Sequence, residues 1–181
     1  RVCACALGQR HSLVAIHRGL PPVGLAGELA AADITDGDRV ARALHLSRPD
    51  AVIHTAALNP GQGTPEEMER VNHRGSRNVA RAAAEVGAHL VHVSTDMVHD
   101  GRSAPYGDDA APAPINSYGE SKAKAERAVL EVLPEASVVR TSLIYGVHEM
   151  DRGTAEFAQR LEAGEDLALF GDVLRQPVWV E

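Results

Sequence analysis

Tyr118 and Lys122 are the residues of this sequence whose types and spacing most clearly suggest chemistry. Lys122 follows Tyr118 by four positions, so on a helix both side chains lie on the same face. An ammonium beside a phenol favours the phenolate, and Lys122 is therefore expected to lower the pKa of Tyr118 towards the range useful for proton transfer. The alternative is an exposed helix with two solvated polar side chains. The spacing alone does not exclude that alternative.

A second pair of polar side chains, Ser94 and Thr95, follows the apolar run "LVHV". Hydroxyls at the end of a strand often serve only as caps. Here the strand, a long loop from 96 to 117 and the Tyr118 helix occur in the order that would bring hydroxyl, phenol and ammonium together. A loop of this length is typical of a lid or binding loop, and ligands of open α/β sheets bind at the carboxyl ends of the strands.

Short apolar runs alternate with helical patterns along the chain, which predicts β-α-β units and an α/β fold with a doubly wound parallel sheet. The predicted strands are 12–16, 29–33, 51–55, 90–94 and 137–141. The predicted helices are 36–46, 65–86, the stretch after Ser117, and 155–163.

Two helix starts carry capping signals. Thr64 precedes a proline and two acids, which suit the positive end of a helix dipole. Ser117 and Glu120 form an S-x-x-E capping box, which predicts that Ser117 caps the helix carrying Tyr118.

The composition excludes several classes of function. Apolar residues make up 44% of the 181 residues and charged residues 24%, as in ordinary soluble domains. A net charge of −7 argues against a nucleic-acid surface. No apolar run is long enough to cross a membrane. Cys3 and Cys5 do not form a zinc pattern, so we expect reduced or buried thiols and no metal. Together these features predict a soluble cytoplasmic protein.

Three motifs in order, "VHVSTD", "YGESK" and "VVRTSLIYG", resemble the extended short-chain dehydrogenase/reductase superfamily. Within it, the sequence is most similar to the dTDP-4-dehydrorhamnose reductase group of sugar-nucleotide reductases. This resemblance implies a Rossmann-like NAD(P)-binding domain over 1–181. It also implies NADPH-dependent reduction of a 4-keto nucleotide sugar, with a homodimer as one option.

The resemblance also assigns roles to individual residues. Tyr118 would protonate the ketone oxygen, Lys122 would lower its pKa and bind the nicotinamide ribose, and Thr95 would hydrogen-bond the reacting oxygen. Asp33 and Ile34 would contact the adenine. The other matched positions are the cofactor-lining Ala56, Ala57 and Leu58 and the substrate-side Asp96 and Leu143.

Other positions keep two interpretations. Arg18, after the second strand of such a fold, favours NADPH over NADH if it meets a 2′-phosphate, but it could also lie on an exposed turn. Asp33 could simply end a strand. Asn72 matches a buried helix Asn of the superfamily, although such residues often only satisfy local backbone. Arg140 lies in an apolar strand and needs an anionic partner, so we expect a structural or diphosphate-facing role.

The sequence departs from the family in several places. The first strand and its glycine-rich phosphate loop are expected to be missing, with residues 1–9 as the tail of the first helix. Only the start of a C-terminal substrate-binding segment, about 144–181, is expected. Met97 and His99 stand where aromatic residues are usual. Two rivals to the reductase remain: a non-catalytic NADP-binding regulatory protein, and a nucleotide-sugar epimerase or dehydratase.

Overall fold

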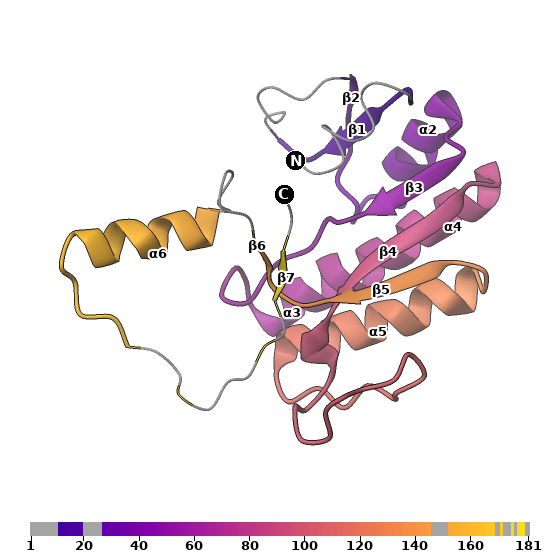
Figure 1. Cartoon of the computed structure of the whole chain (residues 1–181). Helices are drawn as coiled ribbons and strands as arrows, with labels where there is room; N and C mark the ends of the chain where they lie inside the picture. The colour runs from indigo at the N-terminus through magenta and orange to yellow at the C-terminus, as the bar shows by residue number, and fades with distance from the viewer. Residues whose placement is uncertain are drawn as a thin grey trace.

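The computed structural model describes residues 11–19, 27–145, 152–168, 171, 175 and 177–179. Every strand pair within these ranges is parallel, and helices alternate with the strands along the chain (Figure 1). The predicted α/β fold with parallel strands is therefore confirmed. The expectations for residues 1–9 and for Cys3 and Cys5 lie outside the described residues.

The strands pair in three groups rather than in one hydrogen-bonded sheet. A central sheet has the order β3-β4-β5, and two smaller pairs are β1-β2 and β6-β7. All five predicted strands are present within about two residues of their expected bounds. The strands are β1 (Val14–His17), β2 (Glu28–Ala31), β3 (Ala51–His54), β4 (His89–Thr95), β5 (Ser137–Thr141), β6 (Ile144–Tyr145) and β7 (Val178–Trp179).

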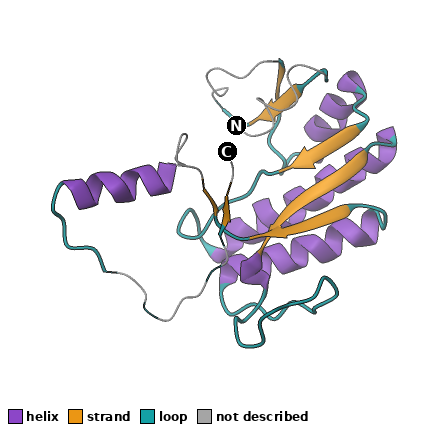
Figure 2. Ribbon diagram, in the orientation of Figure 1, coloured by secondary structure: helices purple, strands orange, loops and turns teal. Residues whose placement is uncertain are grey.

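Three helices, α2 (Gly37–Ser47), α4 (Ser76–Val86) and α5 (Ser117–Val132), gather on one side of the strands (Figure 2). Small residues of α4 let the helices pack closely, and α2 contributes larger apolar side chains. This buried layer fixes α5 against β4, which is how the Tyr118 helix is held at the sheet. Its buried members are Ala32, Val40, Leu44, Val79, Ala80, Ala82, Ala83, Ala88, Leu90, Val129 and Leu133.

The predicted long helix is one continuous run of three parts, α3 (Pro65–Met68), the π-helical segment η1 (Glu69–Gly75), and α4. Thr64 caps it as predicted. Its hydroxyl accepts from the Glu67 amide at 3.3 Å, and the Glu67 carboxylate accepts from the Thr64 amide at 2.8 Å. π-Helical segments are frequent at functional sites, and this one carries Asn72.

The capping prediction for α5 was wrong by one residue. Asn116, with extended backbone angles, is the N-cap, and its Oδ1 accepts from the Gly119 amide at 2.8 Å. Ser117 is already the first helical residue. Both residues are good caps, and the sequence offered no means of choosing between them.

Asn116→Ala should therefore destabilise the protein by about 1 kcal/mol, since the Gly119 amide loses its acceptor. Urea unfolding would measure the change. Ser117→Ala is the matched control and should have a much smaller effect. Equal losses for the two variants would contradict the assignment of Asn116 as the cap.

The loop between β4 and α5 begins with a short 3-10 turn, η2 (Asp96–Val98), and folds back on the end of the sheet. The Ala113 amide donates to the Val98 carbonyl at 2.8 Å, and the rings of His99 and Tyr106 stack with centroids 4.0 Å apart. Helix α6 (Arg152–Glu162) lies apart from the other helices (Figure 1). Within the described ranges, no helix combines the length and apolar character needed to cross a membrane.

Candidate active site

The carboxyl end of β4 and the first turn of α5 form the centre of the candidate site. Thr95, the last residue of β4, is buried, and its hydroxyl accepts from the Met97 amide at 3.2 Å. Gly119, in the first turn of α5, lies against the Met97 carbonyl so closely that a Cβ at this position would overlap it. The glycine of the Y-G motif therefore lets the helix start beside the strand end.

Tyr118 is half-buried in this first turn and lies close to Thr95. Burial raises the pKa of the Tyr118 phenol above its ordinary value. A hydrogen bond with the Thr95 hydroxyl lowers the pKa by a smaller amount, and the Asp96 carboxylate raises it. The sequence correctly placed hydroxyl and phenol together. The expected lowering of this pKa by Lys122 does not occur in the structure.

The position of the Lys122 side chain explains why it does not lower the pKa of Tyr118. Its side chain is only 3% exposed and turns towards the sheet, where Nζ donates to the Val93 carbonyl at 2.8 Å. A second contact joins Nζ to His92 Nε2 at 3.4 Å. Burial lowers the pKa of Lys122 to about 8, and the Glu126 carboxylate partly offsets this. The amine is thus held below the Tyr118 turn in the core, and the exposed-helix alternative is wrong for Lys122.

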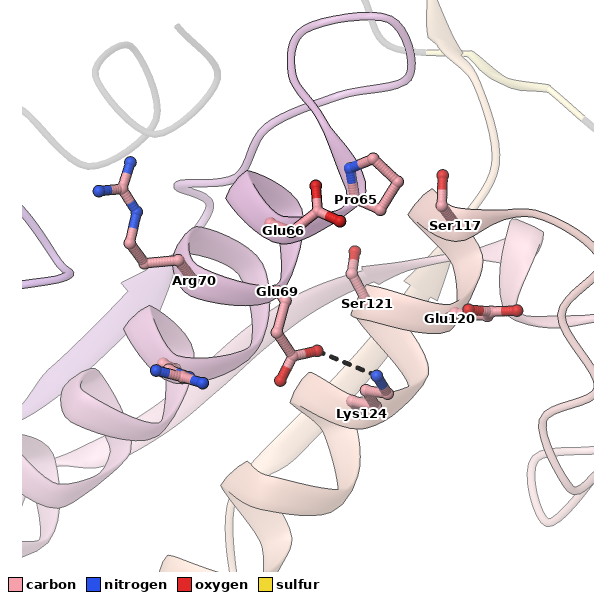
Figure 3. A pocket seen from close by; sticks show the side chains of 9 residues that line it. Pro65, Glu66, Glu69, Arg70, Ser117, Glu120, Ser121 and Lys124 are labelled. Carbon is pink, nitrogen blue, oxygen red and sulfur yellow. Dashed lines mark hydrogen bonds and ion pairs between the residues drawn. The ribbon is translucent and has the colours of Figure 1, made fainter.

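The other lysine, Lys124, faces the opposite way. Figure 3 shows it in a groove of about 470 Å³ between the α3–η1 helix and α5, where it donates to Glu69 at 3.0 Å. Charged residues line most of this groove, and Ser117 and Ser121 line its α5 wall. Neither Tyr118 nor Lys122 lines it. The groove therefore lies behind the candidate site, not within it.

Asn72 does more than satisfy local backbone. Its amide bonds both backbone groups of Leu58, accepting from the nitrogen at 2.7 Å and donating to the carbonyl at 3.0 Å. Its Nδ2 also donates to Ser121 at 2.9 Å, and Ser121 donates to the Tyr118 carbonyl at 2.7 Å. Asn72 is fully buried and ties the loop after β3 to the first turn of α5.

Arg140 finds its anionic partner in Glu126, a buried residue of α5. The guanidinium bonds both carboxylate oxygens, with the shortest distance 2.8 Å, and Nη1 also donates to the Ala110 carbonyl of the long loop at 2.8 Å. Ser94 donates to the same carboxylate. Of its two predicted roles, Arg140 has the structural one, and Ser94 belongs to this network and not to the site.

One of the predicted substrate-side residues, Asp96, has a partner that the sequence did not predict. Asp96 follows Thr95, and Arg175 forms an ion pair with both of its oxygens, each at 2.8 Å. Arg175 is 79 positions away from Asp96 along the chain, and no local pattern pointed to it. Leu143 is 49% exposed, and its carbonyl accepts from the Val178 amide, so it lies beside the start of the β6-β7 pair.

The cofactor-side predictions form two groups. Arg18 and Asp33, which follow β1 and β2, form an ion pair at 3.7 Å. Asp33 also accepts from the Thr35 amide and hydroxyl at 2.9 and 2.8 Å, so it ends its strand with a turn as well. Bonds from Thr35 and the charge of Arg18 outweigh burial and lower the pKa of Asp33. The side chain of Ile34 packs against Gly75 of η1.

The second cofactor-side group is the loop after β3, with Ala56, Ala57 and Leu58. Ala56 is exposed, and the other two are half-buried. The Asn72 contacts hold this loop next to α5. This loop therefore lies at the same end of the central sheet as Thr95, whereas Arg18 and Asp33 follow the separate β1-β2 pair.

The chain is similar to several known proteins. Residues 5–181 match the family described as "RmlD substrate binding domain". A dTDP-4-dehydrorhamnose reductase of Streptomyces griseus is 40% identical over 156 residues, which cover 81% of this chain and 50% of the relative. The methionine adenosyltransferase 2 subunit beta of Pongo abelii is 37% identical over 117 residues, 63% of this chain and 35% of that protein.

Among solved structures, a dTDP-4-dehydrorhamnose reductase from Bacillus anthracis in complex with NADP superposes with a TM-score of 0.66 and 32% identity. The match covers 78% of this chain and 53% of that one. The chain thus spans about half the length of the reductases it matches.

Proposed function

Because the chain belongs to the RmlD substrate binding domain family, we propose that its protein is an NADPH-dependent reductase of a 4-keto nucleotide sugar. The observation that carries the proposal is the pairing of Thr95 with Tyr118 at the carboxyl end of β4, with the Lys122 amine buried one turn below. A purely structural role requires neither a phenol paired with a strand-end hydroxyl nor a buried amine one turn below it. The names of the Streptomyces and Bacillus relatives support the substrate class.

In this proposal Tyr118 is the general acid. NADPH supplies the hydride, and the protein must supply a proton to the ketone oxygen. A phenol is protonated at neutral pH, as a general acid requires, although burial raises the pKa of Tyr118 further from that range. The Thr95 hydroxyl lies beside the phenol and can hydrogen-bond the same substrate oxygen. Asp96 and Leu143 would lie on the substrate side of this pair.

The residues at the edge of the fold suit NADPH, with NADH as the weaker option. The Arg18 side chain is 64% exposed, so its charge is available to a 2′-phosphate although it lies 3.7 Å from Asp33. Asp33 and Ile34 would contact the adenine, and Ala56, Ala57 and Leu58 would line the cofactor. The NADP bound in the Bacillus structure supports this choice.

The organisation and location of the protein are part of the proposal. Residues 1–181 would form one NAD(P)-binding domain, with 144–181 the start of the substrate-binding segment. A protein that uses NADPH and a nucleotide sugar would work in the cytoplasm without nucleic-acid or membrane partners. Such a protein could act as a homodimer.

A second function is favoured by the resemblance to methionine adenosyltransferase 2 subunit beta. That protein is named as a subunit, so this chain could belong to a regulatory partner protein that does not catalyse reduction. Calorimetry of the full-length protein with NADPH, NADH and a dTDP-linked sugar separates the candidates. The reductase must bind NADPH and the sugar nucleotide at one site, whereas a partner protein would not bind the sugar nucleotide.

A further inference from the structure

His92 lies in the middle of β4 and is completely buried. Its Nε2 faces the Lys122 amine at 3.4 Å. On its other side the ring contacts His54 of β3, with the two centroids 5.2 Å apart and the planes tilted by 40°. His54 in turn bonds the Ser76 hydroxyl at 2.9 Å. Two imidazoles and an amine thus share one buried space beneath the candidate site.

The contact with Lys122 fixes the protonation of the His92 ring. A lysine ammonium can only donate hydrogen bonds, so His92 Nε2 must accept and the ring proton must lie on Nδ1. That Nδ1 has no hydrogen-bond partner in the described part of the chain. A buried donor without a partner costs stability. An apolar side chain would avoid this cost, so packing alone does not account for a histidine here.

We propose that His92 is a positioning residue for Lys122. The Nε2 of His92 and the Val93 carbonyl accept from two of the three N–H groups of the Lys122 amine and hold the amine against β4. One N–H is then left for the Tyr118 side of the site or for a cofactor hydroxyl. The importance of that third N–H for catalysis rests on the proposed reductase function. The docking of the amine by His92 does not.

Three other titratable groups face this space. Glu126 of α5 favours the charged form of Lys122, and Tyr118 lies one turn above it. His54 and His92 stay neutral because burial and the charge of Lys122 lower the pKa of both rings. His92 therefore acts on the amine as a neutral acceptor, which stabilises the ammonium without adding a second positive charge.

NMR can follow Lys122 directly. The Cε signals of 13C-labelled lysine in the full-length protein are titrated, and the signal that the Lys122→Arg variant lacks is assigned to Lys122. His92→Leu removes the acceptor, whereas His92→Gln has a similar size and keeps one. His89→Leu is the matched control, because His89 lies on the same strand but is exposed and bonds Ser137.

We expect His92→Leu to lower the titration midpoint of Lys122 by roughly one pH unit, as the loss of a hydrogen bond to a charged group should. In His92→Gln the titration midpoint of Lys122 should lie close to the wild-type value, and in His89→Leu it should equal the wild-type value. Unchanged midpoints in His92→Leu, or equal shifts in the Leu and Gln variants, would overturn the proposal. Failure of both variants to fold would also overturn it, because His92 would then serve only the fold.

The titration needs neither substrate nor cofactor, so it is independent of the reductase assignment. A wild-type protein without reductase activity but with the expected midpoints would retain the His92 proposal and remove the proposed function. In an active protein, His92→Leu should lower kcat with little change in KM, and His92→Gln should recover kcat. This split follows because His92 acts through Lys122 and does not touch the substrate.

Discussion

Replacing Tyr118 by phenylalanine should lower the turnover of NADPH with a 4-keto nucleotide sugar by at least about tenfold, and by about a hundredfold or more if the phenol is the sole acid. The substitution removes one oxygen atom and leaves the ring, so the half-buried position keeps its packing. Binding of the sugar nucleotide should change little, because the lost group acts in the transition state. Steady-state kinetics of the full-length protein would measure kcat and KM separately.

Tyr106→Phe is the matched control. Tyr106 lies in the loop before α5, where its hydroxyl donates to Asp100 at 2.7 Å, and we expect its loss to change turnover far less. Unchanged turnover in Tyr118→Phe would remove the assignment of Tyr118 as the acid.

Removing the carboxylate of Glu126 should destabilise the fold by about 3–5 kcal/mol, the usual cost of breaking a buried ion pair from one side. Glu126→Met leaves the Arg140 guanidinium without its anionic partner and also frees the Ser94 hydroxyl. Because Arg140 also holds the Ala110 carbonyl, the loop before α5 should loosen as well. Urea unfolding of the single variants would measure these losses.

The double variant Glu126→Met/Arg140→Met is the decisive comparison. It removes both charges, so it should recover a large part of the lost stability. Glu131→Gln breaks an exposed pair with Arg127 and should change the free energy of unfolding by less than about 1 kcal/mol. Additive losses in the double variant would contradict the account of Arg140 as the partner of Glu126.

The sequence predicted the parts of this protein that rest on local patterns. Periodicity and turn residues placed all five strands, and Thr64, followed by a proline and two acids, predicted the start of the long helix. The order of strand, loop and helix also brought Thr95 next to Tyr118. Each of these inferences depends on residues close together in the sequence or on the general rule that ligands bind at the carboxyl ends of parallel strands.

The missed features depend on contacts between distant segments. Arg175 and Asp96, or Asn72 and Ser121, are separated by too many residues for any spacing rule. The direction of Lys122 could not be predicted either, because i, i+4 spacing describes an isolated helix and says nothing of a carbonyl on a neighbouring strand. The shift of the α5 cap from Ser117 to Asn116 reflects two adjacent residues of nearly equal capping strength.

The most direct test of the central claim uses NADPH labelled with deuterium at the transferred position. The full-length protein would be incubated with this cofactor and a dTDP-4-keto-6-deoxy sugar, and the product examined by mass spectrometry and NMR. A reductase with Tyr118 as its acid predicts one deuterium at C4, one oxidised cofactor per product, and a much slower reaction in Tyr118→Phe. An altered sugar without deuterium or net NADPH oxidation would contradict the account and favour an epimerase or dehydratase.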